Sequence, residues 1–185
     1  MKKSSVFAGG RTERITLCGL LTAIMLILGF VESLIPFNFG VPGIKLGLSN
    51  GVLIFAIYML GFRTALILMV VKVFFSALLF GSLSMPMWFA FAGGLVSVCL
   101  MGLLSLDRDL SPITVSMAGG LGHNVGQVCM CMLLVTRTNM LFYMGVLMLV
   151  GMLTGAFTGL IADRVITHMK VIGAGRTGKK RSGGA

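Results

Sequence analysis

Acidic residues are scarce in this chain. Only five of its 185 residues are Asp or Glu, and charged residues make up 11% of it, against 57% for hydrophobic ones. A soluble domain is about 45–50% apolar and about 25% charged. This composition excludes a disordered chain, a coiled coil and an ordinary soluble enzyme. The mean hydropathy of +1.03 indicates a membrane protein. At about 20 residues per span, the length leaves no room for a separate soluble catalytic domain.

Catalytic motifs are also missing. The chain contains no P-loop, no GxSxG and no HExxH sequence. Mg²⁺–diphosphate chemistry needs several carboxylates converging on the metal, but the aspartates are limited to Asp107, Asp109 and Asp163. Asp107 and Asp109 flank Arg108, and we predict that they form a solvated turn. With no haem or iron–sulfur ligand set either, we expect no catalytic residue, cofactor or metal site in this chain.

The cysteines follow no metal-binding or disulfide pattern. They are Cys18, Cys99, Cys129 and Cys131, all within apolar stretches and none in a CxxC arrangement. We expect them to act as small buried hydrophobes.

What the sequence does contain is a series of long apolar segments. We predict an all-α membrane protein, a bundle of six transmembrane helices. The predicted spans are 15–35, 46–61, 64–81, 85–105, 113–135 and 141–162. Pro86 suits the first turn of the fourth span. The second span is the shortest, and its Gly-rich outer end is expected to be irregular where it lines a cavity.

Lysine and arginine predict the orientation of this bundle. With both termini cytoplasmic, twelve of the fifteen basic residues lie inside and two, Lys45 and Arg137, lie outside. This asymmetry fits the positive-inside rule. We therefore predict a basic cytoplasmic segment over 1–14, one transmembrane domain over 15–170 and a basic, disordered cytoplasmic tail over 171–185. The basic ends are expected to contact anionic lipid headgroups rather than nucleic acid.

Small residues recur at a spacing of four, which marks close helix contacts in membranes. Three runs are expected to pack within the bundle: Gly43, Gly47 and Gly51; Ala118, Gly122 and Gly126; and Gly151, Gly155 and Gly159. A shorter pair, Gly19 and Ala23, lies on the first span near its cytoplasmic end. This pair is the best candidate for docking another membrane protein.

Polar residues at membrane depth are the most informative feature. A Lys at the bilayer centre costs about 2.5 kcal/mol or more. Lys72 lies nine residues past Arg63, which places it ~14 Å deep at a rise of 1.5 Å per residue. His123 reaches ~15 Å by the same count from Ile113. His123 and Gln127 share one helix face, with Asn124 adjacent to it.

Further polar residues are predicted nearer the outer surface, namely Glu32, Lys45 and Asn50. Together with Lys72, His123, Asn124 and Gln127 they could line a cavity from the outer surface to mid-membrane. Such a cavity would suit an anionic small molecule, partly aromatic or amide-bearing. The alternative is a buried polar network that ties helices together. A direct Glu32–Lys72 pair is not expected, because their predicted depths differ by ~13 Å.

The segments PGIKLGLSN (42–50) and GLGHNVGQ (120–127), within six short-looped spans, resemble one bacterial membrane-protein family. It is known as heptaprenyl diphosphate synthase component I or as the Gx transporter family, and the resemblance covers roughly residues 12–170. The family is similar to the S components of energy-coupling-factor vitamin transporters. That similarity implies six helices in the bacterial cytoplasmic membrane, with Gly19 and Ala23 meeting a coupling subunit.

Three functions stay open on this resemblance. The leading hypothesis is a substrate-binding subunit of a small-molecule transporter, which would work with ATPase and coupling transmembrane subunits. The second is a non-catalytic membrane component of a polyprenyl diphosphate synthase in menaquinone side-chain synthesis. Its partner would be a soluble prenyltransferase chain, because the DDxxD motif is absent here. The third is a quinone- or flavin-linked subunit of an extracellular electron-transfer system.

Overall fold

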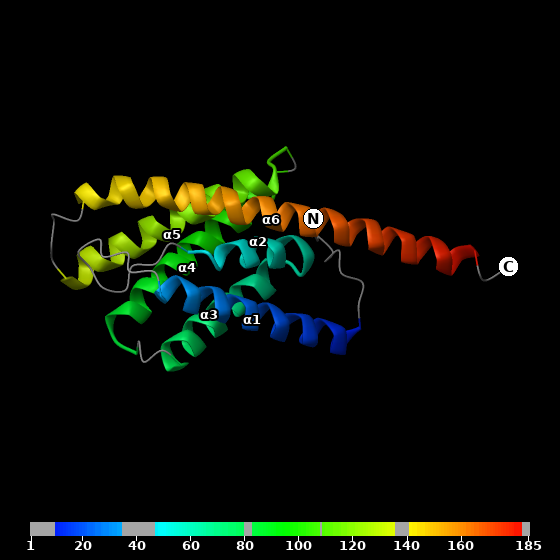
Figure 1. Cartoon of the computed structure of the whole chain (residues 1–185), viewed down its shortest axis with the longest axis horizontal. Coiled ribbons are helices and arrows are strands. Elements are labelled where there is room, and N and C mark those ends of the chain that lie inside the picture. Colours follow the sequence, from blue (N-terminus) through cyan, green and yellow to red (C-terminus); the bar gives the residue numbers. More distant parts are fainter. Residues whose placement is uncertain (1–9, 35–46, 80–82, 108, 136–140, 183–185) are drawn as a thin grey trace.

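A computed structural model describes residues 10–34, 47–79, 83–107, 109–135 and 141–182. Over these ranges the chain is all-helical, as predicted, with no strand. The helices are α1 (Arg11–Leu34), α2 (Asn50–Met59), α3 (Phe62–Leu79), α4 (Met85–Leu104), α5 (Pro112–Val135) and α6 (Leu141–Ser182). Figure 1 shows them as one elongated bundle, with α5 alongside α6 and the short α2 in the middle.

Four helices are long and apolar enough to cross a membrane: α1, α3, α4 and the part of α6 over Met144–Met169. By length and composition they indicate a multi-pass membrane protein. The helix α5 also has 24 residues, but His123, Asn124 and Gln127 lower its hydropathy and it is not among these four. The helix α2 has ten residues, or about 15 Å, which is about half of a 30 Å hydrocarbon core. Six full crossings, and the side on which the termini lie, remain predictions.

Two glycines explain why α2 is shorter than the predicted span over 46–61. Gly47 has φ +83° and Gly61 has φ +95°, a left-handed conformation that favours glycine. Gly47 turns the chain just before α2, and Gly61 ends the connection that follows it. Pro86 lies in the first turn of α4, as predicted.

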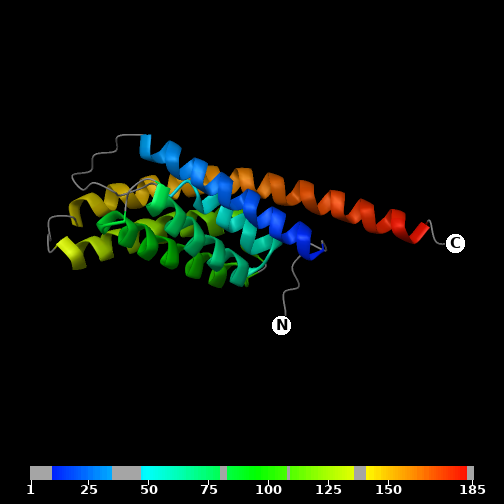
Figure 2. The same cartoon turned by 90° about the horizontal axis from the view of Figure 1, so that it is seen from below.

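The helix α6 runs far beyond its predicted span. It continues to Ser182, where the sequence predicts a disordered segment from residue 171. Extending an existing helix needs no new nucleus, because each added residue gains a backbone hydrogen bond. In both views the C-terminal part of α6 projects past the rest of the bundle, at the end where α1 begins (Figures 1 and 2).

Glycines allow α5 and its neighbours to approach closely. A methyl group on Gly155 of α6 would lie 2.6 Å from the carbonyl oxygen of Ser116 in α5. One on Gly126 of α5 would lie 2.8 Å from the carbonyl oxygen of Ala92 in α4. One on Gly120 would overlap the carbonyl oxygen of Gly151. The predicted packing role of the runs in α5 and α6 is thus confirmed, whereas Gly43 lies outside the described residues.

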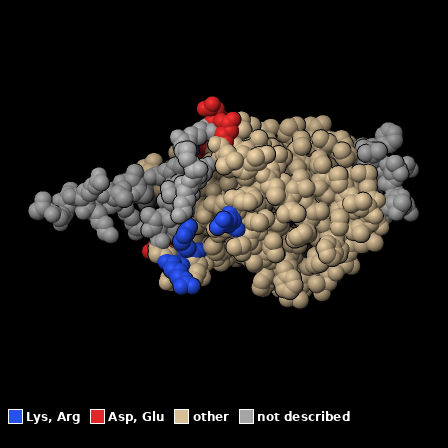
Figure 3. All heavy atoms as spheres, turned by 180° about the vertical axis from the view of Figure 1, so that it is seen from behind, with Lys and Arg blue, Asp and Glu red and all other residues tan. Residues whose placement is uncertain are grey.

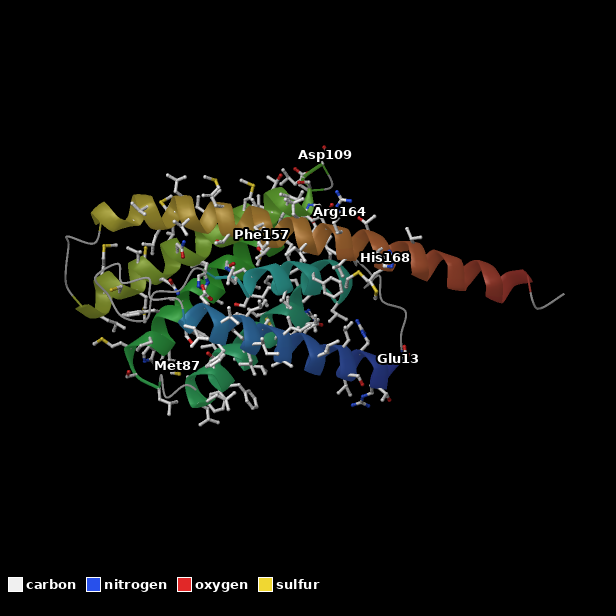
Figure 4. All side chains as sticks on the ribbon, in the orientation of Figure 1. Glu13, Met87, Asp109, Phe157, Arg164 and His168 are labelled. Atoms are coloured by element: carbon white, nitrogen blue, oxygen red, sulfur yellow. The ribbon has the colours of Figure 1, made fainter. Side chains whose placement is uncertain are left out.

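The outer surface of the bundle is apolar, and the described charges on it gather at one end. Figure 3 shows the blue and red atoms on the side of the molecule toward that end, while the other described atoms of this face are uncharged. In Figure 4, Glu13, Asp109, Arg164 and His168 lie toward the end from which α6 projects. One charged end and a long apolar body fit a bundle embedded in lipid with this end in water.

We predict that Gly120→Ala destabilises the protein, because its methyl group would collide with the backbone of α6. Gly145→Ala is the matched control, since a methyl group there meets nothing within 4 Å. An exposed helical Gly→Ala change alone stabilises by about 0.5–1 kcal/mol. Thermal unfolding in detergent should show a lower midpoint for the first variant only. Equal midpoints for the two would contradict the close contact.

Candidate functional site

Polar side chains from α1, α2, α3 and α5 are buried inside this apolar bundle. None of the six that are described exposes more than 7% of its surface. They are Glu32, Asn50, Lys72, His123, Asn124 and Gln127. The seventh predicted residue, Lys45, lies outside the described residues. Burial of polar groups is costly unless they are hydrogen-bonded, so the contacts of each one matter.

Glu32 connects α1 to the turn that precedes α2. The backbone N–H of Gly47 donates a buried hydrogen bond to the Oε1 atom of Glu32. Gly47 adopts its left-handed conformation at this point. The Glu32 carboxylate therefore fixes the turn from which α2 starts.

Lys72 reaches α1 from α3. Its Cε atom lies 4.0 Å from the position that a Cβ atom on Gly29 would occupy. Gly29 and Glu32 are about 4.5 Å apart along the axis of α1, at 1.5 Å rise per residue. The Lys72 side chain therefore ends beside α1, near the helical turn that precedes Glu32. The predicted depth difference of ~13 Å between Glu32 and Lys72 stays a prediction, since the length of the lysine side chain adds to the rise counted along the backbone.

The imidazole of His123 lies between α4 and the turn before α2. A methyl group on Gly47 would lie 3.1 Å from the Cδ2 atom of His123 and 2.7 Å from the Nδ2 atom of Asn50. A methyl group on Gly93 of α4 would lie 3.1 Å from the Cε1 atom of His123 and 2.7 Å from the Cγ atom of Gln127. Gly47 and Gly93 thus provide the space that these polar side chains occupy. His123 and Gln127 share one face, as predicted.

Asn124 points to a different neighbour. Its Nδ2 atom donates a buried hydrogen bond to the carbonyl oxygen of Leu147 in α6, and its side chain fills the space beside Gly151. This contact ties α5 to α6. Asn124 thus does what the alternative of a structural network predicts, on the side of α5 that faces α6.

The sequence interpretation missed two buried hydroxyl groups. Ser49 and Ser97 are fully buried, and their Oγ atoms have no hydrogen-bond partner among the described residues. The same holds for the Nδ2 atom of Asn50 and the Oδ1 atom of Asn124. A buried polar group left without a partner costs about 1–3 kcal/mol. No sequence signal marks such a serine, because serines are common in membrane helices.

Gly19 and Ala23 are exposed on α1. A methyl group on Gly19 would meet nothing within 4 Å. These two residues therefore make no close helix contact within the described bundle, in contrast to the glycines of α5 and α6. The face that they form is free for the docking role predicted from the sequence.

The buried residues offer hydrogen-bond donors and acceptors, one ammonium group and one carboxylate. Among the described residues, no three His, Cys, Asp or Glu side chains come close enough to hold a metal ion. The arrangement can bind a polar group inside an apolar bundle. It does not assemble a metal centre within the described chain.

Fold and site together define a multi-pass helical membrane protein with polar side chains buried inside the bundle. We call these six residues the polar cluster: Glu32, Asn50, Lys72, His123, Asn124 and Gln127. The family model for heptaprenyl diphosphate synthase component I matches residues 21–165, and the chain belongs to this family. The match runs from the first half of α1 into α6 and includes every residue of the polar cluster. It confirms the family resemblance seen in the sequence. Neither a curated protein nor a solved structure matches the chain.

We predict that Glu32→Ala lowers the free energy of unfolding by about 2 kcal/mol, because the Gly47 N–H loses its buried acceptor. Glu32→Gln is the control, since its amide oxygen can still accept that hydrogen bond. Chemical or thermal unfolding in detergent measures both. If Glu32→Ala were as stable as the unmodified protein, the bond to Gly47 would not hold the turn.

Proposed function

We propose that this chain is a membrane-embedded binding subunit that holds a small polar molecule between its helices. The observation that carries the proposal is the cluster of Asn50, Lys72, His123 and Gln127, buried beside glycines that leave room for them. An ionisable residue inside a membrane bundle is a functional-site hypothesis by default, because its burial is expensive.

A purely structural network accounts for only part of the cluster. Glu32 fixes the turn at Gly47, and Asn124 ties α5 to α6. The Oγ atom of Ser49 and the Nδ2 atom of Asn50, in contrast, have no hydrogen-bond partner among the described residues. A bound polar molecule would satisfy them, which favours a ligand site over a network that serves packing alone.

More specifically, the chain acts like the S component of an energy-coupling-factor transporter. It captures its ligand from the outer side of the bacterial cytoplasmic membrane. Both termini are cytoplasmic, and the exposed face of Gly19 and Ala23 meets a coupling transmembrane subunit. The chain has no P-loop, so an ATPase partner has to supply the energy. Differential affinity for the ligand between outward-open and occluded states then drives the cycle.

The family description favours a second candidate. The chain would be the membrane component of a heptaprenyl diphosphate synthase, and a second component would be its partner. Five acidic residues in the whole chain provide no aspartate-rich motif, so catalysis would lie in that partner. Lys72 would then bind the diphosphate of a prenyl chain.

We predict that Lys72→Ala lowers affinity for the bound molecule by about 10-fold or more, because a hydrogen bond from a charged donor contributes about 1.5–3 kcal/mol. Arg63→Ala is the matched control, since Arg63 is an exposed cation on the same helix. Native mass spectrometry of the gently extracted protein measures the bound mass in each. Retention of the molecule by the folded Lys72→Ala variant would contradict this site.

The same spectra separate the two candidates. A water-soluble, vitamin-like mass, or an ATPase with a coupling subunit, supports the transporter subunit. A prenyl diphosphate, or a soluble prenyltransferase chain, supports the synthase component. If no small molecule is bound in any preparation, the binding proposal fails.

A further inference from the structure

The helix α2 begins inside the bundle rather than at its surface. Ser49 and Asn50 expose 0% and 1% of their surface, and α2 contacts every other helix of the described chain. The N-terminal end of a helix carries roughly half a positive charge. Away from water this charge is screened weakly, so it favours a negative group nearby.

Two side chains at this helix end carry hydrogen-bond donors without an acceptor among the described residues. Ser49 precedes α2, yet its hydroxyl makes no capping bond and has no partner among the described residues. The Nδ2 atom of Asn50 has none there either. This amide folds back over Gly47, which places it beyond the start of the helix, next to the ring of His123.

The first backbone N–H groups of α2 already have hydrogen-bond acceptors. The N–H groups of Asn50, Gly51 and Val52 already bond to the carbonyl oxygens of residues 47–49, at 2.9, 3.3 and 3.1 Å. The side chains of Ser49 and Asn50 are therefore what this helix end offers to another molecule.

The charges around this end leave a positive balance. The Gly47 N–H donates a hydrogen bond to Glu32, and the Lys72 side chain ends beside Gly29, three residues before Glu32 on α1. Their opposite charges offset one another. The aligned peptide dipoles of α2 then leave a partial positive charge at this end, which favours an acceptor that carries negative charge.

We propose that the N-terminal end of α2 is the anion subsite of the bound molecule. Ser49 Oγ and Asn50 Nδ2 donate hydrogen bonds to a carboxylate or a phosphate, and Lys72 from α3 offsets the negative charge of Glu32. The ligand is thus a small molecule with an anionic end that enters the bundle. The inference rests on the proposed function, since it assigns one end of the molecule held in that site.

The test uses the full-length protein in detergent, titrated separately with inorganic phosphate, diphosphate and acetate. The readouts are the thermal midpoint and, for the phosphates, the ³¹P line width. Ser49→Ala and Asn50→Ala should each weaken binding of the preferred anion by about 10-fold. Glu32→Gln should strengthen it several-fold, because it removes a negative charge and keeps the acceptor for Gly47.

Ser84→Ala is the matched control. Ser84 also precedes a helix, α4, without making a capping bond, but it is exposed. Binding should be unchanged in this variant, so that a loss in Ser49→Ala reflects the buried position of Ser49 and not the removal of a serine before a helix. If Asn50→Ala does not fold, Ser49→Ala and Glu32→Gln still give opposite expected effects.

The comparison of anions assigns the ligand chemistry. Preference for diphosphate indicates a phosphorylated ligand, preference for acetate indicates a carboxylate, and either supports the subsite if it depends on Ser49 and Asn50. Anion binding that is unaltered in both variants, or no binding of any anion, overturns it.

The outcome for this subsite is separable from that for the proposed function. A co-purified molecule that is lost from Lys72→Ala but retained by Ser49→Ala and Asn50→Ala leaves the binding subunit standing and removes the subsite. Anion binding that depends on Asn50, in a protein that holds no co-purified molecule, keeps the subsite and removes the proposed function.

Discussion

A half-length helix that starts inside an apolar bundle is the constraint on which the rest of this structure depends. Every polar group at such a helix end needs a partner from protein or ligand, because hydrocarbon provides none. The turn at Gly47 takes its acceptor from α1, through Glu32. The ring of His123 packs against the same turn from α5. The position of α2 therefore brings polar residues from distant parts of the sequence together.

Glycine makes this arrangement possible in two different ways. Where Gly120 meets Gly151, the absence of side chains lets two helix backbones touch, and dispersion contacts hold the helices together. Beside Gly93 and Gly47 the space is taken instead by the imidazole and amide groups of other helices. The same residue type thus provides tight packing between α5 and α6 and room for polar side chains between α4 and α2.

The sequence predicted the helical class, the family and the burial of the polar residues, because hydropathy and intramembrane charge are strong signals. It overestimated the length of α2, although the glycines at the outer end of the 46–61 span indicated an irregular start, and the left-handed turn at Gly47 lies there. The contribution of Ser49 depends on where α2 begins, which the pattern of apolar residues does not specify.

The scarcity of acidic residues and the polar cluster together limit what this chain can do. A diphosphate is usually held through Mg²⁺ and several carboxylates, but a buried helix end with a lysine and neutral donors can hold an anion without a metal. In both proposals such a site binds an anion, and the chemistry takes place in another chain. A binding role is therefore common to the transporter subunit and to the synthase component. The two candidates differ in the partner chain, which is a coupling subunit with an ATPase for the transporter and a prenyltransferase for the synthase. The identity of the partner therefore decides the function.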